Sequence, residues 1–224
     1  MAFSGPELSD YENVVSLNEA WLGLVQGDTR LRSGLAGLPE VLIRRLTNLT
    51  RQQIVRLAET PFLLFSFRER DDRYWTRVLS PRHERDLFSA HDTDAVDTLV
   101  SASLGFIWQL ARRNPYTLRL ICGATLYWTE CIAEQTFLGL LEAVRGSGET
   151  PVIRFVNQRE MWRKLLDSGV SPAEITRQAA QLSALQAILT DPPESTAESW
   201  SLAARLVKAP QMCVADGNEP TQSS

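Results

Sequence analysis

The 224-residue chain has few cysteines and few histidines, and both shortages exclude functions. With three cysteines and two histidines, the sequence contains no C-x-x-C or H-E-x-x-H spacing, so we predict no metal site and no cofactor. Cys122 and Cys131 are nine residues apart in what we expect to be one helix, where they would point to opposite faces and could not form a disulfide. A reduced, cytoplasmic protein is the simplest interpretation.

Long hydrophobic runs and catalytic motifs are also missing. The most apolar window, residues 118–144, is interrupted by Arg119, Glu130 and Glu134, so we expect no membrane span. The first residues show no basic start followed by an apolar run, and we expect no signal peptide. The sequence also lacks the phosphate-binding glycine loops and the G-x-S-x-G nucleophile motif, so we predict a protein that is not an enzyme.

Positive charge is concentrated in one third of the chain, and nearly all of it is arginine. Residues 30–85 hold 12 arginines against 6 acidic residues, a local balance of +6 in a chain of net charge −4. A basic surface of this kind can bind phosphates or acidic partners. The alternative is a solvated helical face held by ion pairs. The arginines that follow the apolar segment 62–67 are Arg68, Arg70, Arg73, Arg77, Arg82 and Arg85.

Helical spacing of apolar residues dominates the chain and predicts a mainly α protein, a helical bundle with additional packed helices. Thr50 and Gln53 have the spacing of a capping box. The segment 62–67 is compatible with a strand or a buried helical turn, and residues 1–12 have the composition of a disordered end. We expect helices over residues 14–27, 40–47, from 51 to the break at Pro61, 95–112, 116–144, 156–166 and 172–189.

Three stretches near the start of the chain resemble FlhD, one subunit of the bacterial flagellar master regulator. Residues 17–26 are similar to the family's L-N-x-x-[aromatic]-L-x-L-x-Q helix. Residues 49–60, followed by Phe67-Arg68, resemble its L-T-x-x-Q-[hydrophobic]-V-[basic]-L-A-E-T…F-R block, which is the most specific of the three. Residues 86–91 resemble its D-L-x-x-x-H segment. The resemblance covers about residues 16–105, under half of the chain.

This resemblance implies a helical subunit that dimerises and joins a second, zinc-containing subunit to bind promoter DNA. It places His91 at the end that contacts DNA, although Asp92 follows where the family has threonine. The family also has a cysteine where this chain has Phe65, so an apolar contact would replace an intersubunit disulfide. The candidates for DNA binding are Arg73, Arg77, Arg82, Arg85 and His91. The candidates for the dimer interface are Trp21, Leu24, Phe62, Phe65 and Phe67.

Two breaks in the chain guide the predicted domain organisation. Asn114-Pro115 ends one helical region, and the glycine-rich loop at 146–151 interrupts the next. We predict an FlhD-like regulatory and dimerisation domain over residues 1–112, a helical C-terminal domain over 113–190, and a linker and flexible tail over 191–224.

The leading functional hypothesis is a bacterial transcriptional regulator subunit, an activator of flagellum-biogenesis type, that binds DNA as a homodimer or with a partner subunit. The alternative is a helical protein–protein adaptor without DNA binding, which Asp92 favours because an acid beside a phosphate is unfavourable. A third hypothesis is an enzyme or small-molecule sensor with a pocket among the C-terminal helices, near Glu130 and Glu134.

Overall fold

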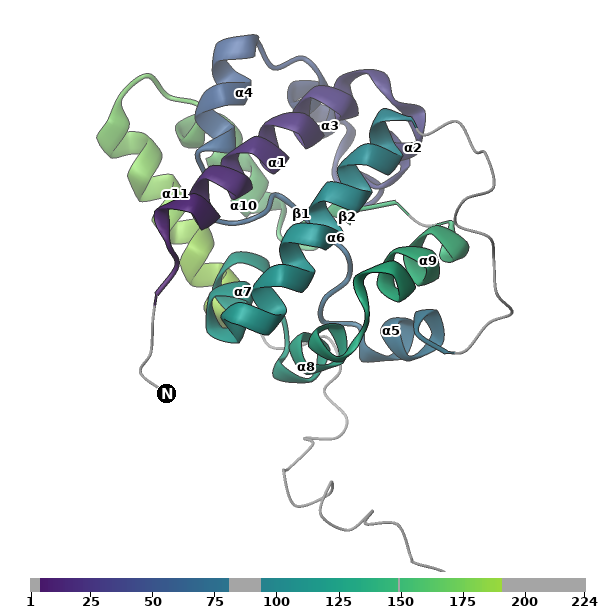
Figure 1. The fold of residues 1–224 in the computed structure, drawn as a ribbon. Helices are drawn as coiled ribbons and strands as arrows, with labels where there is room; N and C mark the ends of the chain where they lie inside the picture. Colours follow the sequence, from purple (N-terminus) through teal and green to yellow (C-terminus); the bar gives the residue numbers. More distant parts are fainter. Residues whose placement is uncertain (1–4, 81–93, 149, 191–224) are drawn as a thin grey trace, which may run out of the picture. The chain divides into compact units, whose positions relative to one another are not determined.

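The computed structural model describes residues 5–80, 94–148 and 150–190, and these are mainly helical, as predicted (Figure 1). The helices before residue 114 are α1 (Leu8–Gly27), α2 (Thr29–Ser33), α3 (Glu40–Thr47), α4 (Arg51–Ala58), α5 (Asp72–Val78) and α6 (Ala95–Arg113). Those that follow are α7 (Pro115–Cys122), α8 (Leu126–Glu134), α9 (Phe137–Ser147), α10 (Arg159–Lys164), a π-helical turn η1 (Leu165–Gly169) and α11 (Glu174–Thr190). In the described ranges, no helix combines the length and apolar character needed to cross a membrane.

The first helix, α1, forms because apolar residues recur on one of its faces. Trp21 on this face is fully buried, and α1 packs against α4 and α6. The helix begins at Leu8, so the prediction of disorder up to residue 12 is wrong for residues 8–12. A capping box between Glu7 and Asp10 explains the early start, because each side chain satisfies a backbone N–H of the first turn.

The predicted capping box at the start of α4 is confirmed. The Thr50 hydroxyl accepts the N–H of Gln53 at 3.3 Å, and the Gln53 side chain accepts the N–H of Thr50 at 2.9 Å. The segment that follows is a strand in part. β1 (Phe65–Ser66) pairs antiparallel with β2 (Val152–Ile153), and Phe65 lies opposite Ile153.

The apolar stretch 116–144 is three helices, so the prediction of one long helix is wrong. Gly123 adopts a left-handed conformation (φ 63°) and ends α7. Thr125 then caps α8 and Thr136 caps α9, each by accepting a backbone N–H of the following turn. Cys122 and Cys131 therefore belong to different helices, α7 and α8, and the argument from opposite faces of one helix does not apply.

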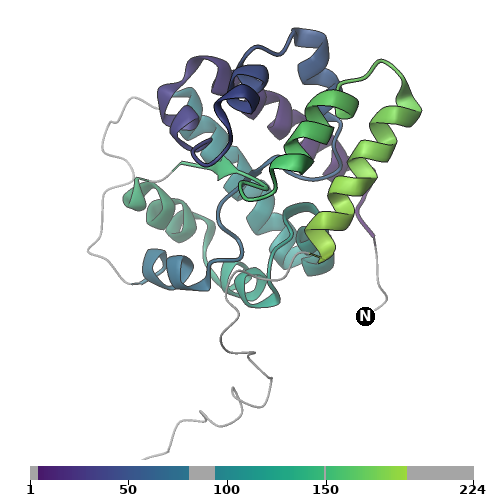
Figure 2. The ribbon, with the colours of Figure 1, turned by 180° about the vertical axis from the view of Figure 1, so that it is seen from behind.

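The last described helices are shorter than predicted. α10 passes into the π-helical turn η1, and α11 begins at Glu174, two residues after the expected start. Figure 2 shows α11 at the edge of the described part of the chain, where it packs against η1 and α7. The predicted tail, 191–224, lies outside the described residues.

One hydrophobic core joins all these helices. α6 packs on α7, α8 and α9, and the tryptophans at 21, 75, 128 and 162 are buried in the same cluster. Residues 1–194 form one compact unit, so the predicted boundary at residue 112 falls inside it.

Candidate nucleic-acid interface

Helix α5 carries the two predicted DNA-binding residues that the structure describes. Arg73 and Arg77 are both exposed on this helix. The other candidates, Arg82, Arg85 and His91, lie outside the described residues.

The ring of Tyr74 on α5 brings two guanidinium groups together. Arg68, which precedes the helix, lies with its guanidinium carbon 5.0 Å from the ring centroid, and Arg77 lies at 5.7 Å. Both distances are within the range of cation–π attraction. With Arg73, these residues form what we call the α5 arginine cluster: Arg68, Arg73 and Arg77.

Two carboxylates open α5, and both have hydrogen-bond partners within the fold. Asp71 caps the helix by accepting the N–H of Tyr74 at 2.9 Å. Asp72 accepts from the hydroxyl of Thr125 at 3.5 Å. The pKa of Asp72 is raised above its ordinary value, mainly because burial disfavours the charged form. The hydrogen bond from Thr125 opposes this shift, and the neighbouring charge of Asp71 adds to it.

Backbone geometry sets the position of Arg68. This residue is left-handed (φ 59°), a conformation that is strained for a residue with a side chain. Its N–H donates to the hydroxyl of Ser66 at 2.9 Å. Phe155 is also left-handed (φ 58°), and the two residues line the same cleft of about 450 Å³. The other polar residues that line this cleft are Ser33, Ser66, Glu69, Arg70, Asp71, Arg154, Asn157 and Gln158.

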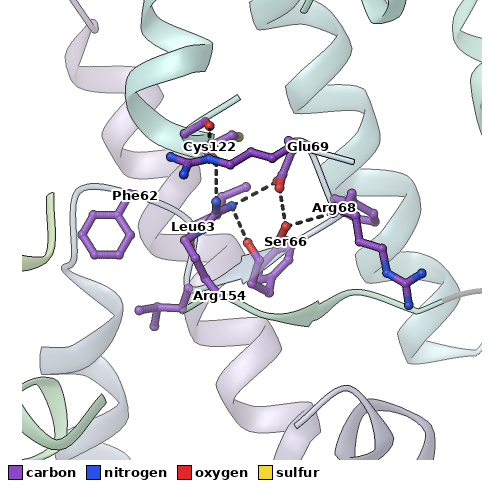
Figure 3. Close-up of polar contacts among 12 residues, drawn as sticks. Phe62, Leu63, Ser66, Arg68, Glu69, Cys122 and Arg154 are labelled. Atoms are coloured by element: carbon purple, nitrogen blue, oxygen red, sulfur yellow. Dashed lines mark hydrogen bonds and ion pairs between the residues drawn. The ribbon is translucent and has the colours of Figure 1, made fainter. Parts of the chain in front are cut away.

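A buried arginine holds the chain segment that leads into α5 (Figure 3). The Arg154 guanidinium donates to the carbonyl of Leu63 at 2.5 Å, to that of Phe65 at 2.7 Å, and to that of Cys122. It also forms an ion pair of 3.0 Å with Glu69, which is 1% exposed. We call these contacts the Arg154 network.

The Arg154 network has a structural role, because the guanidinium N–H groups of Arg154 donate to acceptors inside the protein. Glu69 also accepts a hydrogen bond from the Ser66 hydroxyl, which in turn fixes the N–H of Arg68. The network thereby positions Arg68 beside Tyr74. Burial raises the pKa of the Cys122 thiol, as does the charge of Glu69, while Arg154 lowers it; the thiol is therefore neutral near pH 7.

The other seven described arginines in residues 30–85 also have hydrogen-bond or ion-pair partners within the fold. Arg32, Arg56 and Arg70 donate to backbone carbonyls. The basic segment therefore does not make one continuous patch, and the ion-paired alternative describes the α2–α4 part of it. The ion pairs of this part are Arg30–Asp94, Arg44–Glu40, Arg45–Asp167 and Arg51–Glu19.

The residues predicted for a dimer interface lie mostly in the core of the single chain. Trp21, Phe62 and Phe65 are fully buried, Phe67 is nearly so, and Leu24 is half-buried. The rings of Trp21 and Phe65 pack against each other in a tilted arrangement, with their centroids 5.7 Å apart. These side chains therefore pack the monomer, and a second copy could not reach the buried four without opening the fold. Their apolar character indicated burial but not which surface buries them.

The Arg154 network was not predicted from the sequence. A charged residue between Ile153 and Phe155 is a signal for a buried, paired charge. Its partner Glu69, however, is 85 residues away, and spacing does not reveal that contact.

The third hypothesis placed a pocket among the C-terminal helices, near Glu130 and Glu134. A groove does lie between α7, α8 and α11, but neither glutamate lines it, and neither lines the cleft beside α5. Within the described ranges, no group of three His, Cys, Asp or Glu side chains is placed to hold a metal ion. Comparison of the chain with protein-family models, curated proteins and solved structures finds no match, so the FlhD resemblance stays a prediction.

Proposed function

We propose that this chain is a DNA-binding subunit of a bacterial transcriptional regulator, of the FlhD type that its first half resembles. The observation that carries the proposal is the α5 arginine cluster, in which two guanidinium groups share one tyrosine ring. The sequence runs from this helix directly to Arg82 and Arg85, which add positive charge to the same stretch.

Arginines of this kind would contact phosphates, which gives affinity and orientation without base readout. Sequence preference would then come from a second regulatory subunit. Such a complex would act in the cytoplasm.

The test is fluorescence anisotropy of the whole protein with random-sequence duplex DNA, titrated over a range of salt concentrations. Removal of two cluster arginines, Arg73→Ala with Arg77→Ala, is expected to weaken binding. It should also reduce the slope of log K against log salt by about 2, since each lost phosphate contact removes about 1.

The matched control changes the same net charge elsewhere. Arg44→Ala with Arg51→Ala removes two exposed arginines of α3 and α4 that are ion-paired in the structure. If both double variants weaken binding equally, diffuse charge and not the cluster binds DNA. If the unchanged protein does not bind at low salt, the proposal fails for the isolated chain.

A protein–protein adaptor without DNA binding is the second candidate. The pairing of Arg30, Arg45 and Arg51 with carboxylates from other parts of the chain favours it, because this pairing reduces the basic surface. Absence of DNA binding together with capture of a protein partner would support the adaptor.

A further inference from the structure

Helix α11 exposes a row of large apolar side chains. The exposed fractions are 83% for Ile175, 64% for Leu182 and 59% for Leu189. Because these residues are seven apart, they lie along one side of the helix. The opposite side is buried through Ala180, Ala184 and Ile188. We call the exposed row the α11 face; it lies outside the residues that resemble FlhD.

The α11 face is almost free of charge. Between Ile175 and Leu189 the sequence has one charged residue, Arg177. The Arg177 side chain is 16% exposed, and its guanidinium forms an ion pair with Glu59 at 3.4 Å. Gln178, like Gln186, is exposed and neutral. An exposed helix with three large apolar residues and no exposed charge between them is typical of a protein–protein contact surface.

The C-terminal end of the α11 face meets a groove between α7, α8 and α11. The groove has a volume of about 510 Å³, and Tyr116, Leu120, Leu126 and Leu189 are among its apolar lining. Arg70 and Arg119 also line it, and no carboxylate does so among the described residues. The groove therefore fits an apolar side chain with an acidic group beside it.

The spacing of the α11 face is self-complementary. Leu182 is seven residues from both Ile175 and Leu189, so two antiparallel α11 helices can pair about a two-fold axis through Leu182. In that pairing, Leu182 meets its own copy and Ile175 meets Leu189 of the partner. An interface of this isologous kind closes as a dimer.

The same pairing also fills the groove with a side chain of the partner copy. It brings Ile175 of one copy to the groove of the other copy, because Leu189 lines that groove. Glu174, the first residue of α11, arrives with it and supplies the acidic group opposite Arg119. We propose that two copies of this chain associate through their α11 faces, with Ile175 of each copy inserted in the groove of the other.

The proposed dimer interface needs both the α11 face and the groove to reach the area of a stable interface. Stable interfaces bury about 800 Å² on each partner. A helix of 17 residues is only about 25 Å long. The exposed Tyr116 and Leu126 extend the apolar contact beyond α11.

The first test is the molar mass of the whole protein by analytical ultracentrifugation over a range of concentrations. We expect a dimer, and Leu182→Glu should raise its Kd roughly 100-fold because two carboxylates would face each other at the axis. The matched control is Leu138→Glu on α9, where leucine is 56% exposed, and it should leave the Kd unchanged. A monomer at all concentrations, or a dimer that Leu182→Glu does not weaken, overturns the proposal.

Two further experiments, a cysteine cross-link and a charge reversal, test the geometry. Leu182→Cys should form an intermolecular disulfide under mild oxidation, because the residue meets its own copy, whereas Leu138→Cys should not. Glu174→Arg should weaken the dimer, and Arg119→Glu added to it should restore association. A cross-link of equal yield at both cysteine positions, or no restoration in the double variant, contradicts the antiparallel register. None of these measurements depends on DNA, so failure of the DNA proposal leaves them intact.

Discussion

At the residue scale, Arg154 shows why a buried charge is tolerated here. An isolated guanidinium inside a protein is unfavourable unless hydrogen bonds and an opposite charge replace water. Three carbonyls and Glu69 provide these contacts. The contacts are unequal in number, since Arg154 has four acceptors while Glu69 receives hydrogen bonds from Arg154 and Ser66. Loss of the arginine therefore leaves more groups unsatisfied than loss of the acid's charge.

This asymmetry gives a stability prediction. Arg154→Met should lower the free energy of unfolding by about 3–5 kcal/mol, because it leaves a buried carboxylate without its cation. Glu69→Gln should cost less, about 1–2 kcal/mol, since the guanidinium keeps its carbonyl acceptors and the amide oxygen can still accept. Urea unfolding of the two variants measures both values. Equal costs would contradict the predicted asymmetry, and a cost below about 1 kcal/mol for Arg154→Met would show that the network does not stabilise the fold.

At the element scale, the structure separates what local sequence encodes from what it does not. The capping pair Thr50 and Gln53 identified the start of α4, since both partners lie within one turn. The stretch 116–144 contains similar signals at Thr125 and Thr136, but continuous apolar character hid them, because a buried helix shows no polar side. The α5 arginines could be read from the sequence, whereas their arrangement around Tyr74 required the tertiary fold.

The glycines that end α7 and α9 provide a matched pair of variants. Both are left-handed, Gly123 at φ 63° and Gly148 at φ 68°, so alanine is strained at either position. An added Cβ at Gly123 would lie 2.8 Å from Ile188 and 3.1 Å from Arg70, whereas at Gly148 it would meet nothing within 4 Å. Gly148→Ala should cost about 1–2 kcal/mol of stability, and Gly123→Ala about 2–4 kcal/mol, because only the second adds overpacking. Thermal or urea unfolding will measure both, and equal losses would contradict the packing of α11 on α7.

At the scale of the whole molecule, the described residues before and after the predicted boundary at 112 contribute to one hydrophobic core. β1 pairs with β2 across 86 residues of chain, and Arg154 hydrogen-bonds the carbonyls on either side of Leu64. The N–H of Leu63 also donates to the carbonyl of Ile121 at 3.2 Å. The segment that positions the α5 arginine cluster is therefore held by residues from beyond the predicted boundary at 112.

It follows that residues 1–112 should not fold alone. A fragment of this length would leave the buried side of α6 without α7, α8 and α9, and it would expose the carbonyls that Arg154 and β2 satisfy. We expect such a fragment to lack a cooperative thermal transition in circular dichroism, and co-expression with residues 113–224 to restore one. The control is the whole chain without residues 195–224, which should unfold cooperatively because residues 1–194 form the compact unit. A cooperative transition in the isolated fragment would instead establish residues 1–112 as an independent domain, and the contacts with Arg154 would then be additions to a fold that is already complete.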